Sequence, residues 1–287
     1  MPYPENAPIE EWLAQETPED VLEPDLPIID PHHHLWDMRG VRAPWEQKVY
    51  FCEEMSEEIR ASGHNVVQTV FAQCGAFYRA DGPEEMRCVG ETEYVHGVAA
   101  MSRSGRYGAA RLCTGIFSAA DLRLGKGVEP VLQAHLAASP NFRGIRTGFP
   151  ADPDADQATI ARWQACIDSL ADCPNVVMKC GGAQQRVGRS WEPPFHMYHR
   201  AEGPLSSEEL CDLLYPFYRY AIETLGPDRC MFESNFPVDK ESVSYRTLWN
   251  LMKRIASKMG LSEGEKTSLF SGTAALIYRL PPVTSGE

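Results

Sequence analysis

The stretch IIDPHHHLWD at residues 28–37 places three of the eight histidines of the chain side by side. The apolar residues before them predict a β-strand. Because side chains alternate along an extended chain, His32 and His34 should project to one side and His33 to the other. Two imidazoles on one side can bind a divalent cation or flank a polar substrate. A solvated loop or a buried structural histidine is the alternative, but the H-x-H spacing directly after an apolar strand favours a site.

Basic side chains occur in two later strand-like segments. The segment FRGIR carries Arg143 and Arg146. A guanidinium group suits a carboxylate substrate, although a salt bridge within the fold would explain these arginines equally well. The segment MKCGG places Lys179 among apolar residues, ahead of Gly181 and Gly182, which permit a tight turn or the close approach of a ligand. We therefore predict that the two arginines and the lysine bind substrate.

The final strand-like segment carries polar side chains at its end. The sequence FESNFPVDK offers Glu233, Asn235 and Asp239. Polar side chains that interrupt an apolar strand need partners, which a pocket or the fold itself can supply. A pocket-lining, catalytic role is favoured for Glu233 and Asn235, with a structural role as the alternative.

The other histidines and the common enzyme motifs narrow the chemistry further. His196 and His199 lie in a long loop and are expected at the surface, whereas His64 and His96 are expected to be structural. The sequence has no Walker A motif, no G-x-G-x-x-G, no G-x-S-x-G and no H-E-x-x-H. ATP-dependent, dinucleotide-dependent and serine-esterase chemistry therefore receive no support.

The elements that must position these residues alternate between strand and helix along the chain. This order predicts parallel strands joined by crossover helices, in one α/β domain over residues 26–280. An acidic arm over residues 1–25 precedes this domain, and a short tail over 281–287 follows it. The six predicted strands lie near residues 26–30, 65–74, 110–117, 142–149, 175–182 and 229–238.

Two helix termini carry recognisable capping residues. A helix over 55–63 should begin with Ser56 as its cap and end at Gly63. A later helix should open with a capping box from Ser206 to Glu209.

Composition limits the classes of partner. The chain has 287 residues and a net charge of -13, which disfavours binding to nucleic acid. No apolar run has the length of about 20 residues that a membrane span needs. The acidic, proline-rich start does not resemble a signal peptide. The nine cysteines lack C-x-x-C spacing, so a disulfide framework, a zinc-storage protein or a thiol redox protein is disfavoured and a cytoplasmic location is expected.

Four segments in order, IIDPHHHLWD, FRGIR, NVVMKCGG and DRCMFESNFPVDK, resemble the amidohydrolase-related (amidohydrolase 2) family. The resemblance covers about residues 26–280 and is greatest to the branch with 2-pyrone-4,6-dicarboxylate lactonase and sugar lactonases. It implies a distorted (β/α)8 TIM barrel that hydrolyses lactone, ester-like or amide bonds. It also implies either one divalent metal, zinc or manganese, or metal-independent chemistry.

The resemblance also assigns roles to residues. His32 and His34 match the H-x-H metal ligands of the first strand, and Asn235 falls where the family usually has the aspartate of the last strand. Arg143 and Arg146 match an arginine-bearing fourth strand, which holds substrate carboxylates in the dicarboxylate lactonase. Glu233 is assigned as a base from its position alone.

Two departures from the family pattern affect the expected function. The step from Phe142 to Val176 is one βα unit long, where the family has three steps, two of them carrying a histidine that completes the site. We therefore expect an incomplete barrel of about six parallel strands, shortened by roughly 70 residues. In addition, the neutral Asn235 cannot take a proton from water, so it cannot replace an aspartate base directly.

The expected function is hydrolysis of a small anionic lactone or other cyclic ester, with a divalent metal or with direct activation by histidine. The partner would be a small-molecule substrate, and the chain could form a homo-oligomer. The alternative is a truncated, catalytically impaired barrel that acts as a binding protein, or that represents a splice or gene-model variant.

Overall fold

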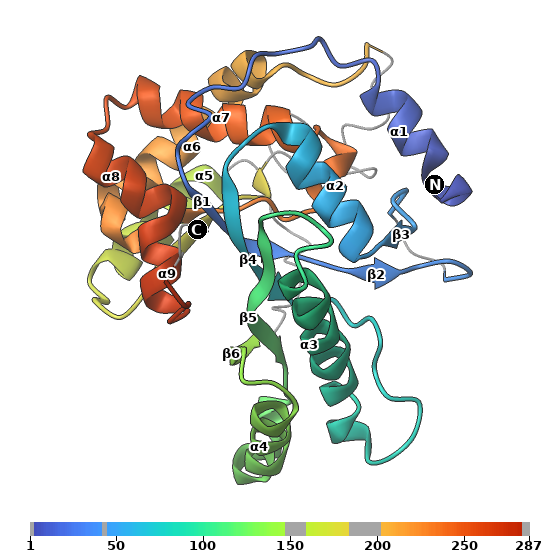
Figure 1. Ribbon diagram of the computed structural model, residues 1–287. Helices are drawn as coiled ribbons and strands as arrows, with labels where there is room; N and C mark the ends of the chain where they lie inside the picture. The colour runs from blue at the N-terminus through green and yellow to red at the C-terminus, as the bar shows by residue number, and fades with distance from the viewer. Residues whose placement is uncertain (1–2, 42–44, 147–158, 184–201, 283–287) are drawn as a thin grey trace.

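The computed structural model describes residues 3–41, 45–146, 159–183 and 202–282. Six parallel strands form the wall of a barrel (Figure 1). They are β1 (Ile28–His33), β4 (Val66–Ala72), β5 (Arg111–Ala119), β6 (Phe142–Arg146), β7 (Met178–Cys180) and β8 (Cys230–Phe232). Each coincides with a strand predicted from the sequence, and the predicted α/β class is confirmed.

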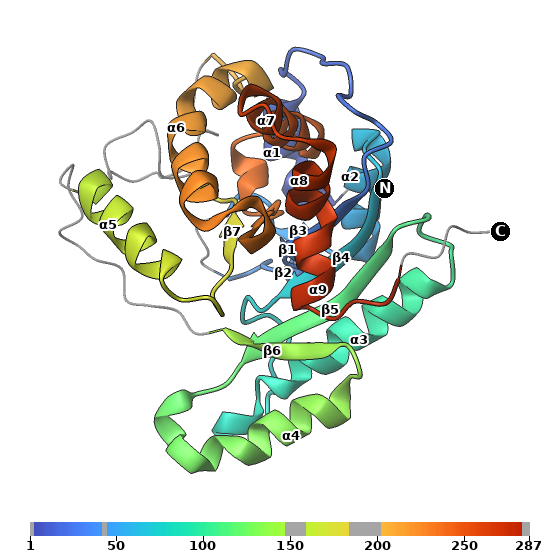
Figure 2. The same cartoon turned by 90° about the vertical axis from the view of Figure 1, so that its left-hand side faces the viewer.

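The strand order shows where the barrel is continuous. One parallel sheet has the order β1-β4-β5-β6, and a second pairs β7 with β8. A parallel bridge between His33 and Phe236 joins the two sheets beside β1. Within the described residues, β6 pairs only with β5 and β7 only with β8. The part of the wall that the structure describes is therefore open between β6 and β7, as expected for an incomplete barrel, and α5 stands apart from both edges in Figure 2.

Helices connect the strands and cover their outer faces (Figures 1 and 2). The α-helices are α1 (Ala7–Leu13), α2 (Cys52–Ser62), α3 (Val89–Arg103), α4 (Glu129–Ala138), α5 (Thr159–Ala171), α6 (Ser207–Leu225), α7 (Tyr245–Lys258), α8 (Glu263–Thr267) and α9 (Thr273–Ile277). Single 3-10 turns are η1 (Pro4–Asn6), η2 (Glu84–Met86), η6 (Pro227–Arg229) and η7 (Asp239–Glu241). The longer 3-10 segment η3 (Leu122–Val128) is kinked at Gly125, and η8 (Ser268–Gly272) is a π-helix. An antiparallel pair that the sequence did not predict, β2 (Trp36–Asp37) and β3 (Val49–Tyr50), follows β1.

The predicted caps have different outcomes. Ser206 and Glu209 form the predicted capping box at α6, and Gly63 ends α2 with a φ of +75°. The prediction for Ser56 was wrong, because α2 begins earlier, at Cys52. There the carboxylate of Glu54 accepts a hydrogen bond of 2.9 Å from the backbone N–H of Phe51.

The N-terminal arm is fastened to the barrel domain by two glutamates. Glu19 accepts hydrogen bonds from the backbone N–H and the hydroxyl of Ser207, the first residue of α6. Glu16 accepts from the backbone N–H of Ser244, directly before α7. Negative charge at a helix N-terminus is favourable because the helix dipole is positive there. The arm therefore stabilises α6 and α7 as well as covering the core with the buried Trp12.

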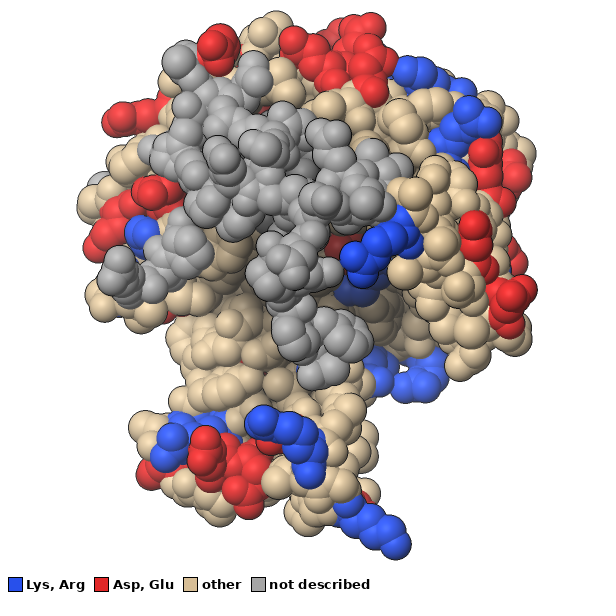
Figure 3. All heavy atoms as spheres, turned by 180° about the vertical axis from the view of Figure 1, so that it is seen from behind, with Lys and Arg blue, Asp and Glu red and all other residues tan. Residues whose placement is uncertain are grey.

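Charge is mixed on the lobe formed by the far ends of α3 and α4, at the bottom of Figure 3. Acidic and basic side chains lie next to one another there. One such pair is Arg123 and Asp121, joined at 2.8 Å. Among the described residues, no helix combines the length and apolar character that crossing a membrane requires.

Candidate active site at the carboxyl ends of the strands

The carboxyl ends of four strands bring six of the seven predicted site residues together. His32 and His34 come from β1, and their Nε2 atoms lie 3.2 Å apart. The six residues of this cluster, called the site cluster below, are His32, His34, Arg146, Lys179, Glu233 and Asn235. Active sites of parallel barrels lie at this end of the strands.

His34 is neutral and has a defined tautomer. Its Nδ1 lies 2.8 Å from the carbonyl oxygen of Ala72, which can only accept, so Nδ1 carries the hydrogen. Burial lowers the pKa of His34 well below its usual value, and neighbouring His32 lowers that pKa further. Nε2 of His34 therefore presents an electron pair to the site cluster.

Asn235 presents a second electron pair to the same space. Its Nδ2 donates a hydrogen bond of 2.9 Å to the carboxylate of Asp239, which turns its Oδ1 toward Nε2 of His34 at 3.3 Å. The backbone φ of Asn235 is +52°. Asparagine is one of the few residues other than glycine that tolerate this left-handed region. The conformation is fixed by a hydrogen bond of 2.8 Å from the backbone N–H of Asn235 to the carbonyl of His32.

His32 lies between a carboxylate and two cations. Its Nδ1 is 2.9 Å from Oε2 of Glu233 and 3.0 Å from Nζ of Lys179. Lys179 donates to the carbonyl of Pro31 and lies 3.4 Å from Glu233. Its ammonium group therefore has two acceptors and does not need Nδ1 of His32 as a third. We assign the hydrogen to Nδ1 of His32, donated to Glu233. Nε2 then faces NH1 of Arg146, a donor 3.5 Å away, with an electron pair.

The one carboxylate of the site cluster, Glu233, is closely paired with Lys179 and His32. Burial opposes the ionisation of Glu233, but the neighbouring His32 and Lys179 outweigh it and lower the pKa of Glu233 to about 2. Burial lowers the pKa of His32, an effect that Glu233 partly offsets. Burial also lowers the pKa of Lys179. Glu233 is therefore a permanent carboxylate near neutral pH, next to an imidazole that stays neutral.

Arg143 is the predicted site residue that the structure does not bring to the cluster. Its guanidinium donates to the carbonyls of Tyr278, Pro140 and Phe142, on the other side of β6. The reason is the alternation of side chains along the strand, which separates Arg143 from Arg146. The same alternation turns His33 away from His34, to the hydroxyl of Thr69 at 2.8 Å.

Two other histidines that the sequence predicted to be structural, His64 and His96, lie in other parts of the fold. His64 contacts the carbonyl of Arg246 and the ammonium group of Lys253. His96 contacts the hydroxyl of Ser139. Both contacts are structural, as predicted. His196 and His199 lie outside the described residues.

A buried hydrogen-bond network holds β1 against the end of β8. Asp30 is fully buried, and its carboxylate accepts from the backbone N–H and the hydroxyl of Ser234 and from the hydroxyl of Tyr245. Asp30 thereby sets the spacing between the H-x-H segment and Asn235. Ser234 and Tyr245 were not identified from the sequence, because Tyr245 begins α7 and no local pattern links it to β1.

The glycine after β7 permits the close approach of Glu233. A Cβ atom on Gly181 would lie 2.2 Å from Cγ of Glu233 and 2.8 Å from its carbonyl oxygen. Any larger residue would displace Glu233 from His32. The close approach that the MKCGG segment predicted is thus made by a side chain of the protein itself.

Three acceptor atoms of the site cluster form a partial metal site. Tetrahedral zinc with ligand distances of about 2.0–2.1 Å requires ligand atoms roughly 3.3 Å apart. The separations of 3.2 Å between the two imidazoles and 3.3 Å between His34 and Asn235 match this value. The backbone hydrogen bond to Nδ1 of His34 is also typical of a metal-binding histidine. Within the described residues, no group of three His, Cys, Asp or Glu side chains surrounds such a position. The cluster therefore fits a divalent cation held by two histidines and one neutral oxygen, a weaker set than three charged or imidazole ligands.

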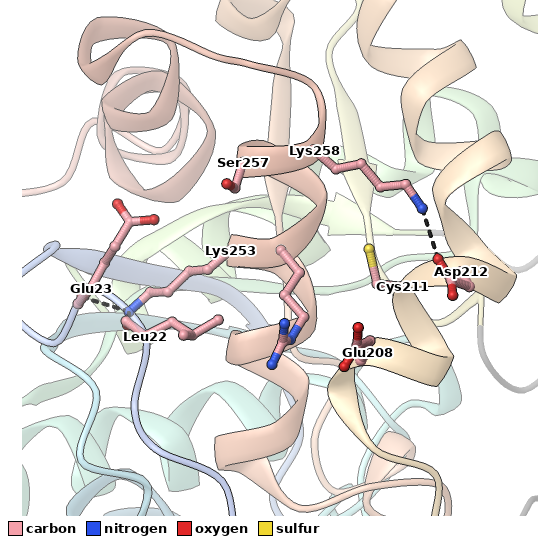
Figure 4. A pocket seen from close by; sticks show the side chains of 9 residues that line it. Leu22, Glu23, Glu208, Cys211, Asp212, Lys253, Ser257 and Lys258 are labelled. Atoms are coloured by element: carbon pink, nitrogen blue, oxygen red, sulfur yellow. Dashed lines mark hydrogen bonds and ion pairs between the residues drawn. The ribbon is translucent and has the colours of Figure 1, made fainter.

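A cavity lies away from the strand ends and the site cluster, between the arm and helices α6 and α7 (Figure 4). Its volume is about 490 Å³. Lys253 donates to the carbonyls of Leu22 and Glu23, and Lys258 pairs with Asp212 at 2.7 Å. These cations serve to hold the arm and the helices together, so the groove is a structural junction.

Comparisons with known proteins agree with this fold. Residues 147–280 match the family model described as Amidohydrolase. The chain is 34% identical over 131 residues to the L-fucono-1,5-lactonase of Burkholderia multivorans, an alignment that covers 46% of this chain and 40% of that enzyme. The fold is similar to the crystal structure of an amidohydrolase from Burkholderia multivorans with bound zinc. The TM-score is 0.63 at 19% identity, covering 88% of this chain and 99% of that chain.

A longer relative bears on the length of the barrel. The uncharacterized protein y4mH of Sinorhizobium fredii is 27% identical over 320 residues, covering 89% of this chain and 99% of that protein. That alignment is longer than the 287 residues of this chain, so the relative contains residues with no counterpart here. The predicted resemblance to amidohydrolase-related proteins is confirmed by the family match over residues 147–280 and by the similar fold.

Proposed function

We propose that the chain hydrolyses a small anionic lactone or other cyclic ester at the site cluster. The single observation that supports this proposal most is the convergence of three electron pairs, from His32, His34 and Asn235, beside the guanidinium of Arg146. Such a space suits a water molecule that donates its hydrogens to the acceptors while its oxygen faces a carbonyl carbon. Arg146 and Lys179 would attract the negative charge of the substrate and of the developing oxyanion.

His32 and Glu233 supply the proton transfers in this proposal. The carboxylate of Glu233 keeps the hydrogen of His32 on Nδ1, so Nε2 accepts a proton from water as the water oxygen bonds to the carbonyl carbon. Arg146 stabilises the resulting oxyanion. The ring C–O bond then breaks, and the proton on Nε2 passes to the leaving alkoxide. The product is an open-chain hydroxy acid, and His32 returns to its starting state.

As an alternative to direct activation by histidine, a divalent metal can be held by His32, His34 and Asn235, and Nε2 of His32 would then bind the metal instead of accepting a proton. When bound there, it would polarise the carbonyl or activate the water. The fit rests on the separations between acceptor atoms, and the neutral amide of Asn235 makes the affinity lower than that of a site with an aspartate.

Metal analysis of the purified chain, after dialysis with zinc, tests whether His32 and His34 bind a metal. About one zinc per chain is expected, lost in the double variant His32→Ala, His34→Ala and retained in the control His96→Ala. Equal zinc content in the wild-type chain, the double variant and the His96→Ala control would show that His32 and His34 are not zinc ligands.

Proton release on ring opening tests the activity itself. A pH-stat assay over a panel of five- and six-membered lactones, with and without a carboxylate substituent, should show turnover by the wild-type chain. Glu233→Gln should lower kcat/KM by about 100-fold, because the tautomer of His32 is no longer fixed. If no lactone in the panel is opened by a chain that melts cooperatively, the hydrolase proposal is wrong.

A truncated barrel without catalysis is the second candidate, and two observations favour it. The wall is open between β6 and β7 in the described residues, and the alignment with the longer relative exceeds the length of this chain. The expected position of the absent strands, between Pro150 and Asp156, lies outside the described residues. Calorimetric binding of a lactone by a chain that does not open it would support this candidate, whereas turnover would contradict it.

Location and assembly are further parts of the proposal. We place the chain in the cytoplasm, because the nine cysteines are free thiols. A homo-oligomer is also proposed, since each open barrel edge could pair with a second copy. Light scattering of the purified chain measures its mass directly, and a monomeric mass would contradict this part.

A further inference from the structure

A large cavity adjoins the site cluster on the side of β4, β5 and β6. Its volume is about 1100 Å³, and Arg146 is one of the residues that line it. NH1 of Arg146 also lies 3.5 Å from Nε2 of His32. The same guanidinium therefore borders both the site cluster and the cavity. A molecule held by Arg146 at the site cluster would extend into this cavity, which we call the side cavity.

The walls of the side cavity expose apolar side chains. Leu122 and Leu124 of η3 are 56% and 40% exposed, and Tyr78 of the loop after β4 is 38% exposed. All three line the side cavity. Leaving large apolar side chains in water is unfavourable, and three around one hollow next to a candidate active site indicate a surface that is covered by a ligand.

Several polar groups around the side cavity are already paired with one another. Nε2 of Gln73 donates to the hydroxyl of Tyr78 at 2.8 Å. Asp121 and Arg123 form a two-pronged ion pair, with both N–O distances 2.8 Å. At these residues, a ligand rich in hydroxyl groups would have to compete with the existing pairs. Three other charged lining residues, Glu84, Glu85 and Arg87, are exposed to solvent. An apolar group would instead cover Leu122 and Leu124 without breaking the existing pairs.

We propose that the side cavity takes an apolar substituent of the substrate, so that the substrate is a lactone with an alkyl or aromatic tail rather than a polyhydroxylated sugar lactone. This inference rests on the proposed function for the reaction, but the ligand chemistry of the cavity can be tested apart from turnover. The lactone carbonyl lies at Arg146 and the site cluster, and the tail lies against Leu122 and Leu124.

The first experiment compares lactones that share a ring and differ in the tail. The substrates are γ-butyrolactone, γ-hexalactone, γ-octalactone, γ-decalactone and a galactono-1,4-lactone, assayed by proton release. Burial of one methylene contributes about 0.8 kcal/mol, which is roughly a fourfold rise in kcat/KM per methylene. The wild-type chain should show this rise along the alkyl series and a low kcat/KM for the sugar lactone.

Variants then assign the effect to the side cavity. In the double variant Leu122→Ser, Leu124→Ser, the ratio of kcat/KM for γ-decalactone to that for γ-butyrolactone should fall by about tenfold or more. Leu136→Ser is the matched control, because Leu136 on α4 is 54% exposed and does not line the cavity. That control should keep the wild-type ratio. A ratio that falls equally in both variants would overturn the assignment.

A binding probe separates this inference from the proposed function. Anilinonaphthalene sulfonate combines an anion with an aromatic body, and its fluorescence reports apolar binding without turnover. Its Kd should rise about tenfold in the Leu122→Ser, Leu124→Ser variant and also rise in Arg146→Gln, but not in Leu136→Ser. If no lactone is opened while this pattern holds, the proposed function fails and the side-cavity inference stands. If lactones are opened but tail length has no effect, or the sugar lactone is preferred, the inference is overturned and the hydrolase proposal stands.

Discussion

Nε2 of His34 lies 3.3 Å from Oδ1 of Asn235, and both atoms direct electron pairs into the space between them. The carbonyl of Ala72 fixes the hydrogen of His34 on the far nitrogen. Asp239 fixes the orientation of the Asn235 amide. Two acceptors in this arrangement are favourable only when a cation or a hydrogen-bond donor lies between them. The ligand-binding capacity of the site therefore follows from backbone and side-chain contacts outside it.

Asn235→Asp should make the chain less stable without metal and responsive to zinc. The new carboxylate would face Asp239 across the position of a 2.9 Å hydrogen bond. Loss of that bond and the repulsion should cost about 2 kcal/mol, or roughly 4–8 °C in Tm. Zinc should restore Tm because it neutralises the added charge. Differential scanning fluorimetry with EDTA and with zinc measures this, and Asn65→Asp, an exposed position, serves as the control. If zinc does not raise the Tm of Asn235→Asp, the result would argue against a cation at this site.

Lys179→Met should reduce lactone opening by about 100-fold in kcat/KM. The substitution keeps the volume of the side chain and removes the ammonium group that lies 3.0 Å from Nδ1 of His32 and 3.4 Å from Glu233. Without Lys179, the pKa of Glu233 should rise, because this cation helps to hold it low. Lys258→Met removes an exposed lysine paired with Asp212 and should leave kcat/KM unchanged. Equal activity of wild type and Lys179→Met would exclude the lysine from catalysis.

Glu91 should make the stability depend on pH in a predictable direction. It is fully buried, accepts hydrogen bonds from the backbone N–H groups of Cys74 and Ala76, and has a pKa raised by burial from 4.5 to about 7. Between these two values the unfolded chain ionises Glu91 and the folded chain does not. The free energy of unfolding should therefore fall by about 3 kcal/mol as pH rises through this window.

Glu91→Gln cannot ionise and should remove the contribution of Glu91, leaving a smaller fall in the same direction from the buried Asp30, whose pKa burial raises to about 6. Urea unfolding at about pH 5 and about pH 8 gives the two free energies. Glu85→Gln, a substitution of an exposed glutamate on η2, should keep the wild-type difference. A pH dependence that is as large in Glu91→Gln as in the wild-type chain would assign it to another group.

Glu19→Ala should destabilise the chain although Glu19 lies in the N-terminal arm. Its carboxylate accepts hydrogen bonds from Ser207 at the start of α6 and from Nδ2 of Asn250 at 3.0 Å. Loss of a charged acceptor at a helix N-terminus should cost about 2–3 kcal/mol, or roughly 4–12 °C in Tm. Glu11→Ala removes an exposed glutamate of the same arm and should change Tm by no more than about 2 °C. Equal Tm values for Glu19→Ala and Glu11→Ala would show that the arm does not cap α6.

Local patterns in the sequence accounted for the elements and for part of the site. Alternation along an extended segment separated His33 from His32 and His34, and the apolar runs gave the six strands. The Ser206–Glu209 box gave the start of α6 because both residues act within one helical turn. These features depend on residues a few positions apart, for which backbone geometry is nearly fixed.

The tertiary structure decided how distant segments meet. Arg146 reaches His32 while Arg143 turns to the carbonyl of Tyr278, a choice that depends on which face of β6 the barrel encloses. The hydroxyl of Tyr245 donates to the carboxylate of Asp30, more than two hundred residues earlier in the chain. Leu122 and Leu124 line a cavity only because η3 folds beside Arg146. The sequence alone indicated the family resemblance, the strands and the paired histidines. Only tertiary packing decided which charges face them, because contacts between segments far apart in the chain leave no periodic pattern in the sequence.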